Sequence, residues 1–212
     1  MHRRGKLCLG VAAAAGAGVL VFGQAAIAQP PAEQETVYAD VDGDGSTEPV
    51  TVRKGDDATQ VISFALPQGT VETTAPANYS VLRTPRVTDV NRDGAAEVAV
   101  IVTAGANTDH FQLFKYDPAA GVVAVESGAE PFTFYEGGGA SARLGYQCED
   151  PGKGPMLRTV RAQYDSSTAK FDGTTSWFIF TGNSASEWTK APFQDLPADD
   201  PALNLDPGTC AP

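Results

Sequence analysis

Two acidic segments of the same design lie 49 residues apart, one beginning at residue 40 and the other at residue 89. Each has oxygen-bearing side chains at its first, third, fifth and ninth positions and a glycine at its sixth, the pattern with which a loop surrounds a hard divalent cation. The expected ligands of the first loop are the side chains of Asp40, Asp42, Asp44 and Glu48 and the carbonyl oxygen of Ser46. Those of the second are the side chains of Asp89, Asn91, Asp93 and Glu97 and the carbonyl oxygen of Ala95. The pattern predicts two calcium sites, each fully within one local segment.

The residues around both loops indicate a repeated β unit. In each copy the loop leads into an apolar, β-branched run, and a second such run follows, at 49–52 and 61–66 in the first copy and at 98–101 and 111–116 in the second. Composition of this kind is typical of strands, and no segment after residue 28 shows a sustained helical period. We therefore expect an all-β protein of antiparallel strands, with repeats near 36–80 and 85–130.

Residues 132–188 have the size of a third unit but contain no acidic loop, so they are either a degenerate copy or an unrelated segment. Within them, 157–164 and 176–181 are strand-like and flank a polar stretch at 165–175, which predicts a hairpin.

The loops do not fit an EF-hand, because position 12 holds Thr51 or Val100 instead of glutamate and strands replace the flanking helices. The pattern D-x-[DN]-x-D-G-x-x-[DE] between two strands resembles the FG-GAP or VCBS-type repeats of integrin-like β-propellers. The resemblance covers about residues 36–125. It implies calcium bound in inter-strand loops of propeller-like blades, in a module that serves adhesion or binding. A propeller needs four to eight blades. The resemblance therefore does not decide whether two repeats and a degenerate third close into a ring.

The first 28 residues have the pattern of a cleavable secretory signal peptide: basic residues, a small and apolar run, and the sequence Ala26-Ile27-Ala28. This predicts a secreted protein, and the pair Arg3-Arg4 leaves the twin-arginine route open beside the general one. Residues 29–35 are rich in proline and charge and are expected to be disordered. The β domain is expected over 36–194 and an extended acidic tail over 195–212.

The charge of the chain restricts the classes of partner that it can bind, and its cysteines predict a disulfide. The whole chain has a net charge of −11, and without the predicted signal 12 basic residues face 26 acidic ones, a net charge of −14. A nucleic-acid or anionic-membrane partner is therefore not expected, because either would need a basic footprint. Membrane insertion after signal removal is not expected either. Cys148 and Cys210 are the cysteines of the mature chain, which predicts one disulfide that ties down the tail; two unpaired thiols are the alternative. We expect a monomer.

Catalysis is not indicated. Asp109 and His110 are neighbours, but no nucleophile, metalloprotease or phosphate-loop motif accompanies them. The expected function is that of a recognition module for an unknown protein or carbohydrate at the cell surface or outside the cell. The alternatives are a secreted hydrolase or inhibitor whose calcium loops only stabilise the scaffold, and a purely structural envelope protein. A deep pocket lined by Asp109, His110 or paired acids would favour the enzyme.

Overall fold

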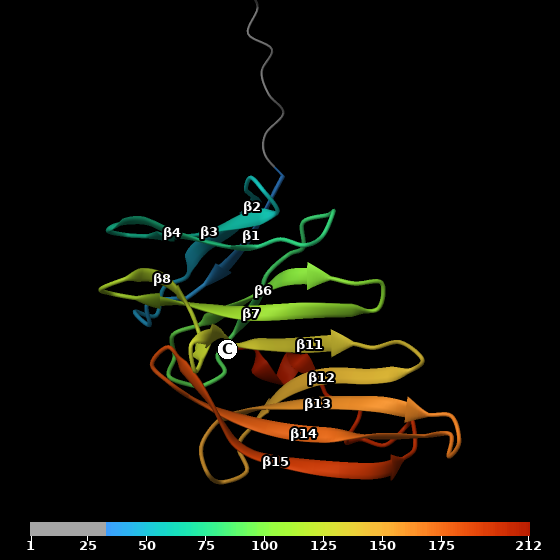
Figure 1. The fold of residues 1–212 in the computed structure, drawn as a ribbon. Coiled ribbons are helices and arrows are strands. Elements are labelled where there is room, and N and C mark those ends of the chain that lie inside the picture. The colour runs from blue at the N-terminus through green and yellow to red at the C-terminus, as the bar shows by residue number, and fades with distance from the viewer. Residues whose placement is uncertain (1–32) are drawn as a thin grey trace, which may run out of the picture. The chain divides into compact units, whose positions relative to one another are not determined.

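The computed structural model describes residues 33–212, which form fifteen β-strands and one short 3-10 helix (Figure 1). The predicted signal peptide and residues 29–32 lie outside this range. All strand pairs are antiparallel except for a single parallel contact between the short β9 and the long β15. The prediction of an all-β protein with antiparallel sheets is confirmed. No helix within residues 33–212 has the length and apolar character needed to cross a membrane.

The first acidic loop belongs to a four-stranded sheet in the order β1-β2-β3-β4. Its strands are β1 (Gln34–Ala39), β2 (Glu48–Lys54), β3 (Thr59–Leu66) and β4 (Gly69–Pro76). In β2, Val50 and Val52 alternate with partly exposed residues, as expected for a strand with one face in the core. β1 starts inside the segment expected to be disordered, because Glu35 pairs with Val52 and so extends the sheet.

The second unit repeats this meander and shares its third strand with the rest of the protein. It consists of β5 (Arg86–Thr88), β6 (Glu97–Ala104), β7 (Thr108–Asp117) and β8 (Gly121–Ala124). β6 is buried on both faces: Val98 and Val100 pack into the core cluster of the first sheet, whereas Ala99 and Ile101 pack into a second cluster. This strand therefore joins the two cores.

The third region is a five-stranded meander that extends the second sheet from β7. Its strands are β11 (Thr133–Gly137), β12 (Ala142–Glu149), β13 (Met156–Asp165), β14 (Lys170–Thr181) and β15 (Ser184–Leu196), with the short β9 (Glu126–Ser127) and β10 (Glu130–Pro131) at its edge. Over residues 33–212 the sheet ends at β5 and β10 and stays open. The polar stretch at 165–175 was predicted to connect the two strands of a hairpin, but the connection is shorter. Pairing with β13 and burial of Phe171 and Thr175 extend β14 back to Lys170.

The residues after β15 are not an extended tail. Leu203 is buried against Val160, Ala162 and Phe171, and apolar packing of this kind holds the segment on the sheet. The 3-10 helix η1 (Pro207–Cys210) then brings Cys210 to Cys148, with their Cα atoms 4.8 Å apart. The predicted disulfide between these cysteines is present.

Candidate metal centre

The first acidic loop connects β1 to β2 and folds around the carboxylate of Asp40. One oxygen of Asp40 accepts hydrogen bonds from the backbone amides of Gly43 (2.8 Å) and Asp44 (3.1 Å), and the other accepts one from Gly45 (2.8 Å). Gly43 and Gly45 have φ angles of 76° and 89°, a region that suits residues without a Cβ atom. The glycines thus let the chain turn tightly enough to surround an acidic centre.

Three carboxylates of this loop converge. Asp40, Asp42 and Glu48 each place one oxygen within 4.8 Å of the others, an arrangement that could hold a metal ion. Glu48 is only 4% exposed, and its Oε2 accepts a hydrogen bond from the amide of Val41 (3.1 Å). Burial raises the pKa of Glu48, and the carboxylates of Asp42, Asp44 and Asp40 raise it further. A cation at the centre would relieve both effects.

The second loop, between β5 and β6, has the same backbone architecture. Asp89 accepts hydrogen bonds from the amides of Asp93 (3.2 Å) and Gly94 (3.2 Å), and Gly94 has the same φ of 89° as Gly45. The seventh position also corresponds: the amide of Ser46 donates to Asp44 (2.7 Å), as the amide of Ala95 donates to Asp93 (2.9 Å). The matching hydrogen bonds identify the loops as copies of one design.

Asn91 makes the second loop different. Its Oδ1 accepts from the amide of Asp93 (2.9 Å), and this bond directs its Nδ2 towards two carboxylates, Asp93 (2.8 Å) and Glu97 (3.2 Å). The amide nitrogen thus takes part of the role that a cation would play. Over residues 33–212, the first loop is the one place where three acidic, histidine or cysteine side chains gather within 4.8 Å.

Glu97 is the most deeply buried acid of the two loops, with 2% of its surface exposed. Its Oε2 accepts a hydrogen bond from the amide of Val90 (3.0 Å). Burial raises the pKa of Glu97 from 4.5 to about 7; the amide of Val90 and the charge of Lys115 oppose this rise, whereas Asp93 and Asp89 add to it.

This buried acid predicts a pH dependence of the metal-free protein. In the unfolded chain Glu97 ionises near pH 4.5, but in the fold it stays protonated to about pH 7. Its contribution to stability is therefore complete below pH 4.5 and is lost as the pH rises through 7, by up to about 3 kcal/mol. Urea unfolding in calcium-free buffer should show this loss between pH 5 and pH 8. Glu97→Gln does not titrate, so the loss in this variant should be smaller and come from the raised pKa of Glu48. Equal losses in the two proteins would contradict the assignment.

The two loops lie against each other. The amide of Ala96 donates to the carbonyl oxygen of Asp40 (2.7 Å), and a Cβ atom added to Gly43 would lie 3.5 Å from that of Ala95. The amide of Asp89 in turn donates to the carbonyl oxygen of Cys210 (2.9 Å). The second loop is therefore hydrogen-bonded to the first loop on one side and to the disulfide-bonded C-terminal segment on the other.

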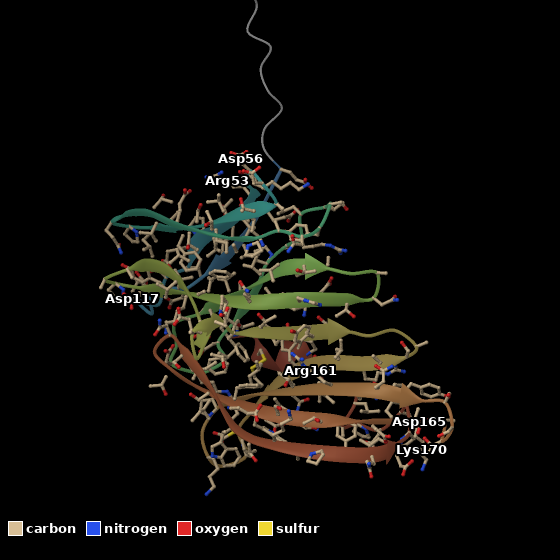
Figure 2. All side chains as sticks on the ribbon, in the orientation of Figure 1. Arg53, Asp56, Asp117, Arg161, Asp165 and Lys170 are labelled. Carbon is tan, nitrogen blue, oxygen red and sulfur yellow. A yellow bond between two sulfur atoms is a disulfide. The ribbon has the colours of Figure 1, made fainter. Side chains whose placement is uncertain are left out.

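Other turns of this protein contain a single aspartate and provide a comparison for the acidic loops. Asp117, in the turn between β7 and β8, accepts from the amides of Ala119 (2.8 Å) and Ala120 (2.9 Å) (Figure 2). Asp165 accepts from the amide of Ser167 (2.8 Å) in the turn before β14. Each is one carboxylate that closes its own turn. The first acidic loop differs because three of its carboxylates, those of Asp40, Asp42 and Glu48, converge.

The neighbouring Asp109 and His110 are not organised as an acid–base pair. A cavity of about 310 Å³ is bordered by Asp109, Glu136 and Arg86. The carboxylate of Glu136 forms an ion pair with Arg86, whose Nη1 lies 2.6 Å from Glu136 Oε2. His110 packs edge-on against Tyr135, with ring centroids 4.6 Å apart. Within residues 33–212 no hydrogen bond joins His110 to Asp109.

Comparisons with protein-family models, with curated proteins and with solved structures found no match. The resemblance to FG-GAP or VCBS-type repeats thus stays a hypothesis that the two loops carry.

Proposed function

We propose that this protein is a secreted, calcium-binding β protein of the FG-GAP or VCBS type that serves as an adhesion or recognition module, with calcium as a structural part of its inter-strand loops. The convergence of Asp40, Asp42 and Glu48 within 4.8 Å is the observation that carries the proposal. The disulfide adds support for export, because such bonds persist in oxidising compartments.

Calcium suits the first loop better than other common metals do. Its side-chain ligands are all carboxylates, which favours a hard cation over zinc or copper. An irregular loop of this kind matches the flexible coordination of calcium, whereas magnesium requires near-ideal octahedral geometry. The second loop is proposed as the weaker site, because Asn91 replaces a carboxylate and its Nδ2 must turn away before a cation enters.

The position of the loops favours a structural role for the ions. The loops lie where the first sheet meets the second, joined by the hydrogen bond from Ala96 to Asp40. Val41 of the first loop belongs to one core cluster and Val90 of the second loop to the other. Neutralising the carboxylates there would stabilise the junction between the two cores. Affinities of about 10⁻⁴–10⁻³ M, typical of extracellular modules, would keep such sites filled outside a cell.

A count of bound ions tests the proposal. Isothermal titration calorimetry of the mature chain should give two calcium ions per molecule, and Asp40→Ala and Asp89→Ala should each remove one, because each deletes the central carboxylate of its loop. Ser46→Ala is the matched control: it changes a loop side chain but keeps the carbonyl oxygen that we assign as a ligand. An unchanged count in both aspartate variants would refute the proposal.

A further inference from the structure

A second candidate site lies on the meander β11–β15, and its lining residues, from Thr133 to Lys190, include none of the proposed loop ligands. It is a cavity of about 260 Å³ whose walls come from all five strands. Thr159 pairs with Ser176, and Ser176 pairs with Lys190, so these three side chains share one face of the sheet. Arg161 lies two residues beyond Thr159 on the same face.

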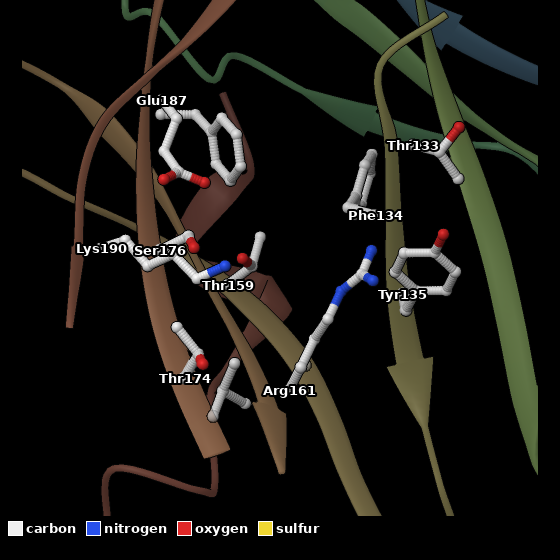
Figure 3. Close-up of a pocket in the computed structure, with 12 residues that line it drawn as sticks. Thr133, Phe134, Tyr135, Thr159, Arg161, Thr174, Ser176, Glu187 and Lys190 are labelled. Carbon is white, nitrogen blue, oxygen red and sulfur yellow. The ribbon is translucent and has the colours of Figure 1, made fainter. Parts of the chain in front are cut away.

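Arg161 is held in place by stacking. Its guanidinium carbon lies 3.9 Å from the centroid of the Tyr135 ring, and Tyr135 is itself packed against His110. Figure 3 shows Arg161 reaching towards Phe134 and Tyr135 on one wall, with Glu187 and Lys190 on the opposite wall. A guanidinium fixed on an aromatic face loses less freedom when it binds an anion.

The charges of this cavity have no partners of their own. Within residues 33–212 the ion pairs do not include Arg161, Lys190 or Glu187. Two such cations at one cavity stand out in a chain that has 15 basic and 26 acidic residues. The site can therefore accept an anionic group from solution without breaking an existing ion pair.

We propose that this cavity binds a sugar unit that carries a carboxylate, an inference that rests on the proposed role as a recognition module and names its ligand class. The guanidinium of Arg161 offers two parallel N–H donors to a carboxylate, and Lys190 adds a second positive charge. Thr159 and Ser176 supply hydroxyl groups that both donate and accept. The volume lies just below the range of about 300–1,000 Å³ for drug-sized ligands, which fits one sugar ring.

Glu187 distinguishes a sugar from an acidic peptide side chain. A simple carboxylate would bring a like charge towards Glu187 with no donor to offer it. Sugar hydroxyl groups, in contrast, donate to a carboxylate while the acid group of the same sugar pairs with Arg161. A carboxylate alone satisfies Arg161 and Lys190, whereas a sugar acid also offers several hydroxyl donors to Glu187.

The inference is tested on the calcium-saturated mature chain by NMR titration, in which ¹H–¹⁵N correlation spectra report the backbone amides. Three probes of similar size are compared: methyl glucuronide, methyl glucoside, which lacks the carboxylate, and N-acetylglutamate, which lacks the ring. We expect methyl glucuronide alone to shift the amides of the cavity residues. Arg161→Gln should weaken its binding about tenfold or more, as for the loss of a charged hydrogen bond. Arg53→Gln, the same change at a partly exposed site on β2, should leave binding unchanged.

Each other outcome overturns the inference. Equal binding of the glucoside would remove the role of the carboxylate, tighter binding of N-acetylglutamate would indicate an acidic peptide, and shifts confined to other residues would place the ligand elsewhere. The calcium count on the same samples separates the two proposals. Two bound calcium ions without glucuronide binding would refute only this inference, whereas glucuronide binding without calcium would refute only the calcium sites.

Discussion

Removal of the disulfide is expected to destabilise the mature protein by about 4 kcal/mol, the largest single effect that we predict. Cys148 and Cys210 are 62 residues apart, and a cross-link that closes so long a loop strongly restricts the unfolded chain. In the fold, Cys210 is fully buried and its carbonyl oxygen holds the amide of Asp89 in the second loop. Loss of the bond therefore should also loosen this contact to the second acidic loop.

The measurement is urea unfolding of the double variant Cys148→Ala/Cys210→Ala, in which alanine avoids burying an unpartnered hydroxyl group. A reducing agent should lower the stability of the wild-type protein by a similar amount and leave the double variant unaffected. The melting temperature should fall by roughly 10 °C, given about 2–4 °C per kcal/mol for a domain of this size. A loss below about 1 kcal/mol would show that packing of Leu203, rather than the disulfide, anchors the C-terminal segment.

Calcium is expected to raise the stability of the folded protein by about 1.4–2.7 kcal/mol for each site at 10 mM free ion, from affinities of about 10⁻⁴–10⁻³ M. The effect is expected because the fold brings Asp40, Asp42 and Glu48 together and fixes Asn91 beside Asp93 and Glu97 in the second loop, so the ion should bind the native state in preference to the unfolded chain. Both sites together should raise the melting temperature by roughly 10 °C. Differential scanning calorimetry in chelator and in excess calcium measures this shift.

Two controls separate binding from charge screening. Sodium chloride at the same ionic strength should give a much smaller shift, because screening acts on exposed charges without occupying a site. The double variant Asp40→Ala/Asp89→Ala should melt at one temperature with or without calcium. Identical melting of the wild-type protein in chelator and in calcium would contradict the proposed function.

Much of the local structure could be predicted because its causes are local. The β-branched run expected at 98–101 lies in β6, and the run expected at 111–116 lies in β7. The stretch 165–175 was harder: Gly173, Thr174 and Thr175 have no strand pattern by themselves, and pairing with β13 makes them a strand. The C-terminal segment was misjudged because Leu203 is a single apolar residue whose partners are remote in sequence.

The sequence alone determined the two acidic loops, because nine consecutive residues contain each proposed ligand set and the glycine that lets the chain turn. It also indicated the disulfide and the antiparallel strands. Only the tertiary structure decided that Ala96 joins the loops through Asp40, that Glu97 is buried, and that Arg161 stacks on Tyr135. The physical reason is that such contacts depend on sheet register and on how strands remote in sequence pack, and neither is encoded in any short segment.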